Sequence, residues 1–460
     1  MPDMPFLPVH ALNGLFRSGQ LSPVELLEAN LAQIRAHDHV LHAFISVSEE
    51  RAREQAARLT AELRRGKVRS SLHGVTLAVK DVLDVAGSVT SNGVTLASAP
   101  AMSSCRAVER LERAGAIVIG KTNTPAYAAY SDTSSTVGGT TCNPWNPRLS
   151  SGGSSGGSAV AVASGMCALA LGTDLGGSVR GPAAWCGVFG LRPSSGRISR
   201  DPHGWVDDSI EVIGAMSRDI RDLSLWLQLA QQSVPCDRPC SSSSRALRIG
   251  SSDDLHGRIA LADEVRDAFS RCMESLSKAG HNVIHRSPHV DAAIDAIRPL
   301  RALRALATYS ADDLPIIERH NTHLFEFMRW ARTLSSEYLG LGGQLRTRAW
   351  RENQAFFDDI DVFIMPTSQI SGIEAGQLNP KMIGGRKIDD PLEVWLSTYI
   401  ISILGWPSVT IPCGWSQPGR PMGIQVTGPV GSDLELLAIS ERLCEQMGWH
   451  SDRPMLDDAI

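Results

Sequence analysis

Two glycine and serine clusters, separated by an apolar stretch, constrain the fold of this chain most strongly. Residues 150–158 read SSGGSSGGS, and a second glycine pair stands before Ser178 in the segment GTDLGGS. Taken alone, the first cluster is typical of a flexible linker, but a linker joins exposed ends. Here the intervening residues 159–172 are rich in alanine, valine and leucine. We therefore expect both clusters to be tied to a core, and residues 159–172 to form a buried helix.

Glycine pairs beside serines have a chemical use. Residues without a Cβ let the backbone bring several N–H groups towards one point, and such a nest binds an oxyanion. In acyl transfer the substrate carbonyl oxygen becomes negatively charged, and losing one donor typically costs about 10²- to 10³-fold in rate. The candidate donors are consecutive: Leu175, Gly176, Gly177 and Ser178. These patterns leave the nucleophile open among four serines: Ser154, Ser155, Ser158 and Ser178.

A serine nucleophile needs a base, and no histidine lies in a comparably distinctive setting. Lys80 ends a segment in which Val75, Leu77 and Val79 alternate with other residues, a pattern that predicts a strand with one buried face. To act as a base, a lysine must be buried, because its reference pKa of about 10.4 must fall by several units. A lysine at a strand end is usually solvated, so the alternation makes Lys80 a candidate only.

Helices and strands alternate along the chain, which indicates an α/β fold with a large sheet. Ser22, Pro23 and Glu25 form the signature of a helix start. Further helices are predicted at residues 48–65 and 106–114, and strands at residues 116–119, 248–250, 283–285, 362–365, 408–412 and 423–426. Proline and serine predict a loop at residues 231–244, and residues 292–351 are mostly helical in pattern and could cap the site.

Composition excludes several classes of function. The 460 residues are 43% apolar and 20% charged with a formal charge of −5, which is typical of a globular protein and demands no nucleic-acid partner. The apolar segment at residues 159–172 is shorter than the roughly 20 residues of a membrane span. The nine cysteines include no CxxC pair, and an odd number cannot all be bridged. With no signal-peptide pattern at the start, we expect a cytoplasmic protein.

Residues 152–194, from GGSSGG through GTDLGGSVR to GLRPS, closely resemble the signature of the amidase signature family. The resemblance extends to LHGVTLAVKDVLDVAG, GKTNTPAYA, NPWNP, DVFIMPT, GWPSVTIP and RPMGIQVTGP, in family order over about residues 20–450. It implies one α/β/α domain over residues 1–460 around a large mixed sheet. Its expected parts are an N-terminal helical segment, a catalytic core, a variable and partly helical cap, and a return to the core sheet: residues 1–65, 66–230, 231–360 and 361–460.

The resemblance also implies roles for three residues. Ser178 becomes the nucleophile, Ser154 a bridging serine held by a cis peptide after Gly153, and Lys80 the base. Ser178 would attack a carbonyl, Ser154 would pass the proton to Lys80 and then to the leaving nitrogen, and water would hydrolyse the acyl-enzyme. Ser155 is then a supporting residue. No metal and no cofactor are implied.

Other residues around the triad are expected to support the loop or the substrate. Asp174 and Arg180 flank the nucleophile and are predicted to form an ion pair that holds the loop. Gly181 is smaller than is usual in the family, which suggests a roomier acyl pocket. The stretch that resembles the substrate-lining segment contains Tyr127, Ala128, Ala129 and Tyr130. No charged cluster lies near the motifs, so we expect small to medium neutral amides, anilides or carbamates.

Three rival motifs are less consistent with their surroundings. Residues 115–122 satisfy the phosphate-loop formula, but their variable positions read as a strand. Residues 152–156 satisfy GxSxG, the nucleophile elbow of esterases, yet a proline-broken loop precedes them where the elbow needs a strand. Histidines at 281, 285 and 289 flank a strand-like segment with a proline, so they would not share a helical face for a metal. His320 and His323 are expected on a helix surface.

Two readings of the function remain beside a stand-alone amidase. Members of this family also serve as the amidase subunit of a larger, glutamine-dependent aminoacyl-tRNA amidotransferase, and an esterase activity would use the same triad. A pseudoenzyme scaffold is less favoured, because Lys80, Ser154 and Ser178 are all present. A homodimer is common in the family.

Overall fold

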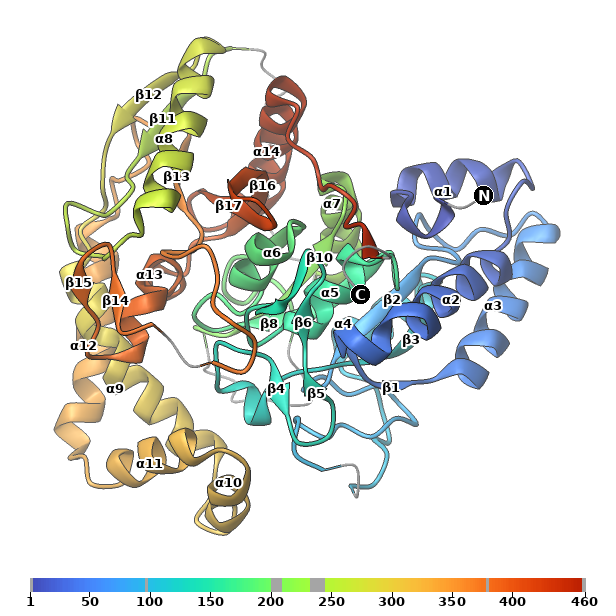
Figure 1. Ribbon diagram of the computed structural model, residues 1–460, viewed down its shortest axis with the longest axis horizontal. Helices are drawn as coiled ribbons and strands as arrows, with labels where there is room; N and C mark the ends of the chain where they lie inside the picture. Colours follow the sequence, from blue (N-terminus) through green and yellow to red (C-terminus); the bar gives the residue numbers. More distant parts are fainter. Residues whose placement is uncertain (1–2, 96–97, 200–208, 232–244, 378–379, 457–460) are drawn as a thin grey trace.

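One mixed sheet of eleven strands runs through the molecule, with helices on both faces (Figure 1). A computed structural model describes residues 3–95, 98–199, 209–231, 245–377 and 380–456. In spatial order the strands are β1 (Phe44–Val47), β3 (Ile117–Thr122), β2 (Thr76–Lys80), β8 (Leu169–Asp174), β10 (Val212–Ser217), β9 (Phe189–Arg192), β16 (Ser408–Gln417), β17 (Arg420–Thr427), β13 (Val362–Pro366), β11 (Arg248–Ser251) and β12 (Asn282–His285). The predicted α/β fold with a large mixed sheet is confirmed.

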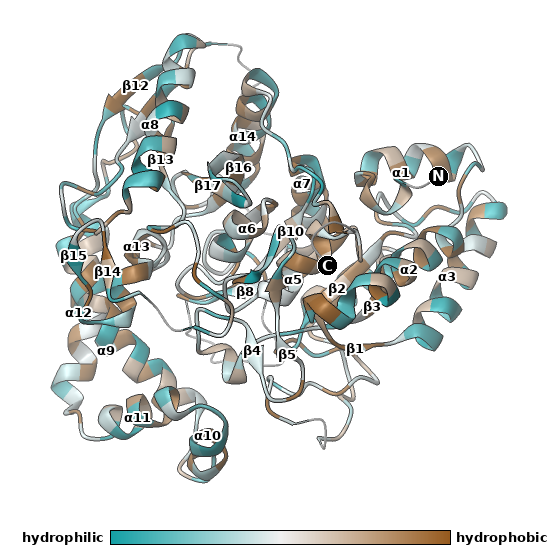
Figure 2. Cartoon of the chain, in the orientation of Figure 1, coloured by the Kyte–Doolittle hydropathy of each residue, from teal (hydrophilic) through white to brown (hydrophobic). Residues whose placement is uncertain are grey.

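Helices cover the sheet on two sides. The described helices are α1 (Val9–Arg17), α2 (Pro23–Leu41), α3 (Glu49–Arg64), α4 (Arg106–Arg113), α5 (Gly156–Ala163), α6 (Arg180–Cys186), α7 (Ile220–Ala230), α8 (Asp263–Lys278), α9 (Asp291–Thr308), α10 (Leu314–His320), α11 (Thr322–Ala331), α12 (Ser336–Glu352), α13 (Leu396–Leu404) and α14 (Asp433–Met447). Hydrophilic residues lie on outer turns such as those of α3, and hydrophobic residues gather at the centre (Figure 2).

Short elements complete the chain. They are the 3-10 helices Met4–Phe6, Ala126–Ala128 and Pro391–Trp395, and three two-stranded ribbons that pair β4 (Ser134–Ser135) with β5 (Gly139–Thr140), β6 (Cys142–Asn143) with β7 (Asn146–Ser150), and β14 (Met382–Ile383) with β15 (Arg386–Lys387).

Strand β2 is buried on both faces, so the expectation of one buried face is wrong. It pairs in parallel with β3 and β8. Leu77 and Val79 join a core cluster shared with α1, α4 and α7, whereas Ala78 joins the opposite cluster, shared with α2, α3 and α5. An inner parallel strand is covered on both sides by its crossover helices, which is why its end at Lys80 lies inside the protein.

The N-terminal helices begin where the sequence predicts. The Ser22 N–H donates to the Glu25 carboxylate at 2.8 Å, and the Glu25 N–H donates to Ser22 Oγ at 3.3 Å. This reciprocal pair is the capping box expected from the sequence. The helices α3 and α4 and all the predicted strands are also present.

Residues 159–172 are not one helix, and this prediction is wrong. The helix α5 ends at Ala163, Gly165 adopts a left-handed φ of +69°, and β8 begins at Leu169. A buried strand and a buried helix have the same apolar composition, so periodicity does not separate them over a few residues. The left-handed turn at Gly165 is the physical reason for the break.

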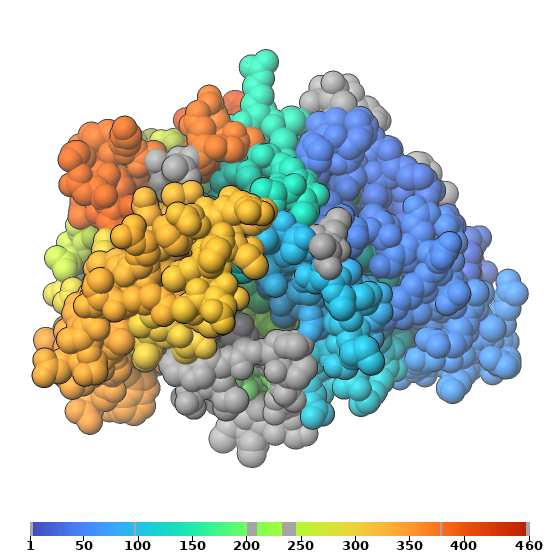
Figure 3. Space-filling view, turned by 90° about the horizontal axis from the view of Figure 1, so that it is seen from below, coloured from blue at the N-terminus to red at the C-terminus, as the bar shows by residue number. Residues whose placement is uncertain are grey.

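Residues 291–352 form α9 to α12, so the helical pattern predicted for this segment is confirmed. Figure 3 shows this segment, yellow to orange, lying directly beside cyan and teal segments from the first half of the chain. The predicted loop at residues 231–244 lies, apart from Gln231, outside the described residues. None of the described helices is long and apolar enough to cross a membrane.

Candidate active site

Lys80 stands at the carboxyl end of β2 with its side chain fully buried. Its Nζ donates hydrogen bonds to Ser154 Oγ at 2.7 Å and to Thr173 Oγ1 at 3.0 Å. Thr173 comes from β8, which is paired with β2 in the sheet. The sheet places Lys80 beside Thr173, and the segment between β7 and α5 brings Ser154 to the same amine. Lys80 and Ser154, two of the three residues predicted as the triad, thus lie together although they are 74 residues apart in the chain.

The segment at residues 150–158 is buried throughout, so it is not a linker. It runs from β7 into α5, and the Gly153–Ser154 peptide is cis, as the resemblance implies. Thr133 anchors the turn, since its Oγ1 donates to the Gly152 carbonyl at 2.8 Å and accepts the Gly156 N–H at 3.1 Å. A Cβ on Gly157 would lie 2.5 Å from the backbone of Asn123, so this position needs glycine.

Ser178 lies in the loop between β8 and α6. Its carbonyl accepts the Ser155 N–H at 3.1 Å, which holds the two glycine and serine segments together. Ser154, Ser178, Leu175 and Gly176 line one cavity of about 790 Å³. The two serines thus line the same cavity, and Lys80 contacts it only through its hydrogen bond to Ser154.

Asp174 anchors the loop that carries Ser178. It accepts the N–H groups of Gly177 at 3.0 Å and Val179 at 3.2 Å, and Gly177 adopts a φ of +110° that favours glycine. The Gly177 N–H therefore points at Asp174, away from the predicted oxyanion nest. Of the four predicted donors, Leu175, Gly176 and Ser178 remain.

The predicted ion pair between Asp174 and Arg180 is present at 2.8 Å, and both side chains are fully buried. The sequence did not indicate Arg192, which reaches the same carboxylate at 3.2 Å from β9. Burial alone would raise the pKa of Asp174, but the two guanidinium groups hold it well below its usual range. Arg180 also donates to Gln425 Oε1 at 2.9 Å and to Ser402 Oγ at 2.8 Å, so the loop is fastened to β17 and α13.

The cavity is lined largely by aromatic and apolar side chains. Tyr127, Ala128, Ala129 and Tyr130 belong to its lining, where the resemblance places them. Further lining residues lie outside the motifs. Arg301, Arg304, Tyr309 and Phe327 lie in the helical segment 292–351 that was expected to cap the site, and Glu211, Trp395 and Tyr399 lie in segments that the sequence did not mark. The expectation of no charged cluster at the site rested on the motifs alone, whereas these charges come from other segments.

Gly181 does not leave the extra room that its size suggests. A ring carbon of Trp395 lies 2.9 Å from the place a Cβ would occupy, so the tryptophan fills the space. Trp395 also lines the cavity and packs against Trp185 with ring centroids 5.3 Å apart.

The rival motifs have structural explanations. The phosphate-loop match continues as the buried strand β3 through Lys121, which pairs with Asp81 at 3.1 Å. A strand, β7, does precede the GxSxG match, so the expected loop is wrong there. It pairs with β6 and, through Leu149, forms a bridge to Glu374, and it stays outside the central sheet.

The histidines considered as metal ligands in the sequence have individual structural roles. His281 is buried and bonds to Gln446 Oε1 at 2.9 Å, and residues 282–285 form β12 as expected. His323 is exposed on α11, but its ring also lines the cavity beside Tyr130, with centroids 5.8 Å apart. No signal in the sequence marked this second role.

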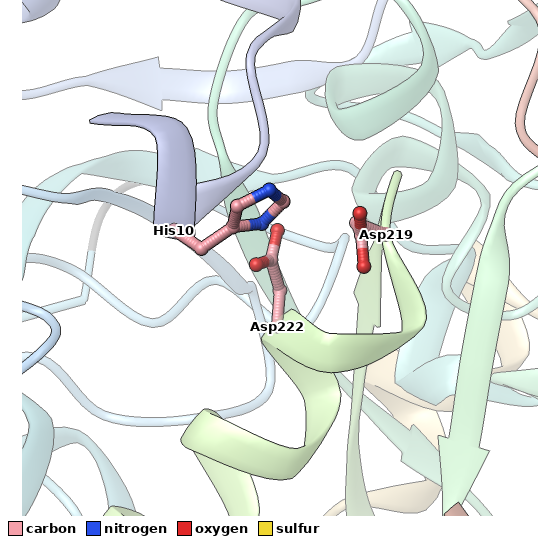
Figure 4. A group of neighbouring side chains, drawn as sticks. All are labelled: His10, Asp219 and Asp222. Atoms are coloured by element: carbon pink, nitrogen blue, oxygen red, sulfur yellow. The ribbon is translucent and has the colours of Figure 1, made fainter. Parts of the chain in front are cut away.

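His10, Asp219 and Asp222 point towards one another where α1 meets α7 (Figure 4). Within the described part of the chain this is the one group of histidine and acidic side chains close enough to hold a metal ion. Asp222 accepts the Val9 N–H at 3.1 Å, and Asp219 accepts the Arg221 N–H at 2.9 Å and pairs with its guanidinium. The two carboxylates thus serve as helix caps.

Comparison with known proteins agrees with this geometry. The sequence profile of the Amidase family matches residues 25–437. The glutamyl-tRNA(Gln) amidotransferase A subunit of Prochlorococcus marinus (strain MIT 9211) is 31% identical over 92% of this chain and 93% of its own length. The corresponding protein of Chloroflexus aggregans (strain MD-66 / DSM 9485) is 32% identical over 99% of each.

Solved structures show the same fold. A crystal structure of an amidase superposes with a TM-score of 0.85 at 30% identity, over 96% of this chain and all of that one. The 6-aminohexanoate cyclic dimer hydrolase with its substrate gives 0.87 at 26% identity, over 98% of this chain and 99% of the other. A bacterial aryl acylamidase gives 0.86 at 26%, over 96% and 97%. The chain belongs to the amidase signature family of hydrolases, which act on C–N bonds.

Proposed function

We propose that the chain is an amidohydrolase that cleaves amides through an acyl-enzyme on Ser178. The observation that carries this proposal is the fully buried Lys80, whose Nζ lies 2.7 Å from Ser154 Oγ at the cavity that Ser178 lines. A buried amine within hydrogen-bond reach of a hydroxyl is the arrangement that general-base catalysis requires.

The proposed reaction has two halves. Ser178 Oγ attacks the carbonyl carbon, its proton passes to Ser154 as Ser154 gives its own proton to neutral Lys80, and the relay returns a proton to the leaving nitrogen. Water then attacks the acyl-enzyme with the same relay and releases a carboxylic acid. The N–H groups of Leu175, Gly176 and Ser178 are the proposed donors to the oxyanion, because they border the cavity where the reacting carbonyl would lie.

We propose aryl amides, anilides or carbamates as the substrate class. The cavity of about 790 Å³ suits a substrate with an aromatic or cyclic part, and its walls include several aromatic rings. The likeness to an aryl acylamidase and to a cyclic dimer hydrolase supports the same range.

A second candidate is the amidase subunit of a glutamine-dependent amidotransferase. The specific observation that favours it is the identity of 31–32% with the A subunit of the glutamyl-tRNA(Gln) amidotransferase over nearly the full length of both chains. In that case the isolated chain would need partner subunits. For the stand-alone enzyme we propose a homodimer in the cytoplasm, which is consistent with the free and mostly buried thiols of the seven described cysteines.

The test is an activity screen of the purified chain across aryl amides, aliphatic amides, carbamates and matching esters. We expect hydrolysis of at least one amide class, loss of turnover in Ser178→Ala, and an intact-mass increase equal to the acyl group when the wild-type enzyme is quenched during turnover. Ser275→Ala is the matched control, because this half-buried α8 serine does not line the cavity and its hydroxyl donates to the Arg271 carbonyl of its own helix.

Three results would contradict the proposal. Turnover that survives Ser178→Ala removes the nucleophile assignment. Hydrolysis of esters without hydrolysis of any amide contradicts the assignment as an amidase. Glutamine hydrolysis that appears only after partner subunits are added would contradict the stand-alone enzyme and support the amidotransferase subunit.

A further inference from the structure

Charged side chains in the cavity wall carry information about the substrate. The lining includes four carboxylates and three cations: Asp84, Glu211, Asp313 and Asp389, and Arg301, Arg304 and Lys381. Glu211 pairs with Arg304, and Asp389 pairs with Lys387 at 2.5 Å. The other two carboxylates accept hydrogen bonds from neighbouring hydroxyl groups, Asp84 from Thr90 and Asp313 from Ser310. Each lining carboxylate therefore already has a partner.

Two lining cations, Arg301 and Lys381, have no carboxylate partner among the described residues, and they differ in burial, because Lys381 is exposed and Arg301 is not. Arg301 projects from α9 and is half-buried, yet among the residues described by the structure it forms no hydrogen bond and no ion pair with a carboxylate. Its guanidinium instead lies over two rings, 5.1 Å from the centroid of Phe327 and 5.7 Å from that of Tyr399. Aromatic faces hold a guanidinium by cation–π attraction and leave the N–H groups along its edge free to bind an anion.

Tyr399 connects this cation with the loop that carries the nucleophile. The same ring packs so closely on Gly176 that a Cβ there would lie 2.2 Å from it. Arg301 and Gly176, one of the proposed oxyanion donors, thus both lie against the Tyr399 ring, and all three residues line the same cavity. A group bound by Arg301 would belong to the substrate, a short spacer away from the reacting carbonyl.

We propose that Arg301 is a specificity-determining residue that binds a carboxylate on the amide substrate. This inference deepens the proposed function and rests on it. A planar guanidinium and a carboxylate form two parallel charge-assisted hydrogen bonds, and an unpaired cation in a partly desolvated wall favours an anionic ligand over a neutral one. The substrate is then an amide with a carboxylate on its acyl or its amine part, and not the neutral amide expected from the motifs.

The test compares matched anionic and neutral substrates. The acyl pair is the para-nitroanilide of succinic acid against that of pentanoic acid, and the amine pair is para-acetamidobenzoate against para-methylacetanilide. We expect the wild-type enzyme to prefer the anionic member of one pair by about 10- to 100-fold in kcat/KM. Arg301→Gln should reduce that ratio to about threefold or less. The control is Arg298→Gln, because Arg298 lies one turn earlier on α9, pairs with Asp390 and does not line the cavity.

Binding without turnover separates this inference from the proposed function. In the Ser178→Ala background, calorimetric titration should show phenylpropionate binding at least tenfold more tightly than phenylpropanol, and Arg301→Gln should remove the difference. Equal binding of the two ligands, or an anionic preference that survives Arg301→Gln, overturns the role of Arg301. If no amide is hydrolysed while the binding preference persists, the proposed function fails and the anion site stands.

Discussion

Lys80 and Thr173 show how single residues prepare the proposed base. The amine is fully buried and has two hydroxyl neighbours, Ser154 and Thr173. A protonated amine donates to both oxygens, and a neutral amine can accept the proton of one of them. Because only Ser154 also borders the cavity that Ser178 lines, the two neighbours should differ in their effect on catalysis.

Lys80→Ala should lower kcat by about 10²- to 10⁴-fold, the usual contribution of a positioned base. Thr173→Val removes the other hydroxyl at nearly constant volume and should cost about tenfold or less. Both are measured as steady-state hydrolysis of the best substrate from the screen, with thermal unfolding to confirm folding. Turnover that persists in Lys80→Ala would contradict Lys80 as the base and would favour the alternative in which residues 152–156 form the nucleophile elbow of an esterase.

Gly176 is a position that requires glycine, because the ring of Tyr399 occupies the space of a side chain there. A Cβ at this position would meet three ring atoms of Tyr399 at 2.2 to 2.4 Å. Gly176→Ala must therefore displace the ring and the adjoining loop, and we expect about 1–3 kcal/mol of destabilisation together with a large loss of kcat. Gly340→Ala is the control, since nothing lies within 4 Å of its added Cβ on the exposed α12. Equal effects of the two substitutions would show that the ring contact is unimportant.

At the scale of elements, the start of α1 is coupled to the start of α7. The Asp222 side chain on α7 accepts the first N–H of α1, from Val9, and it is almost fully buried. Burial raises the pKa of Asp222 to about 8, with a further contribution from the neighbouring Asp219. A protonated carboxyl group still accepts this bond through its carbonyl oxygen, so the cap persists in the neutral form.

This pKa predicts how stability depends on pH. An aspartate in the unfolded chain titrates near pH 3.9, so between about pH 4 and pH 8 the folded chain keeps a proton that the unfolded chain has released. The contribution of Asp222 to the free energy of unfolding is therefore greatest below about pH 4, falls as pH rises towards 8, and is constant above it.

Asp222→Asn keeps the acceptor for Val9 and removes the titration. We expect its melting temperature relative to wild type to rise between pH 5 and pH 8.5, with a gain on the order of 1–3 kcal/mol in unfolding free energy at the upper end. The exposed Asp267→Asn on α8 matches the charge change. Parallel pH profiles for wild type and Asp222→Asn would contradict the raised pKa.

The elements that the sequence predicted well are those with local signals. The capping box fixes the start of α2, and the alternation before Lys80 places β2 correctly. The prediction of one helix over residues 159–172 is wrong because an inner strand such as β8 shows no alternation of apolar and polar residues. Only the left-handed turn at Gly165 separates this strand from α5. Composition within an apolar core does not distinguish the two.

At the scale of the molecule, the site is assembled from segments that sequence alone does not connect. Arg192 reaches Asp174 through the strand order β8, β10, β9. Arg301 and Tyr399 come from α9 and α13, which pack on each other. The proposed triad could be named from the sequence because its motifs are local, whereas the charge of the cavity depends on tertiary packing, and the proposed substrate class depends on that charge.

The whole sheet also bears on whether the chain is one folding unit, as the resemblance implies. Strands from the first half of the chain occupy one side of the sheet and strands from the second half the other, and they meet where β9 pairs with β16. One core cluster contains residues from Val9 to Cys444 and crosses this seam. Neither half can keep its strand edge and its apolar face from water without the other.

We therefore expect one cooperative unfolding transition, with coincident midpoints by tryptophan fluorescence, far-UV circular dichroism and calorimetry. Described tryptophans lie on both sides of the seam, among them Trp226 and Trp406, so fluorescence reports on both halves. A fragment of residues 1–230 should remain largely unfolded, because β9 would lose its partner β16. Ser178→Ala should unfold in the same single transition. Two separated midpoints, or a 1–230 fragment that folds cooperatively, would mean that the triad and the return strands belong to independent domains.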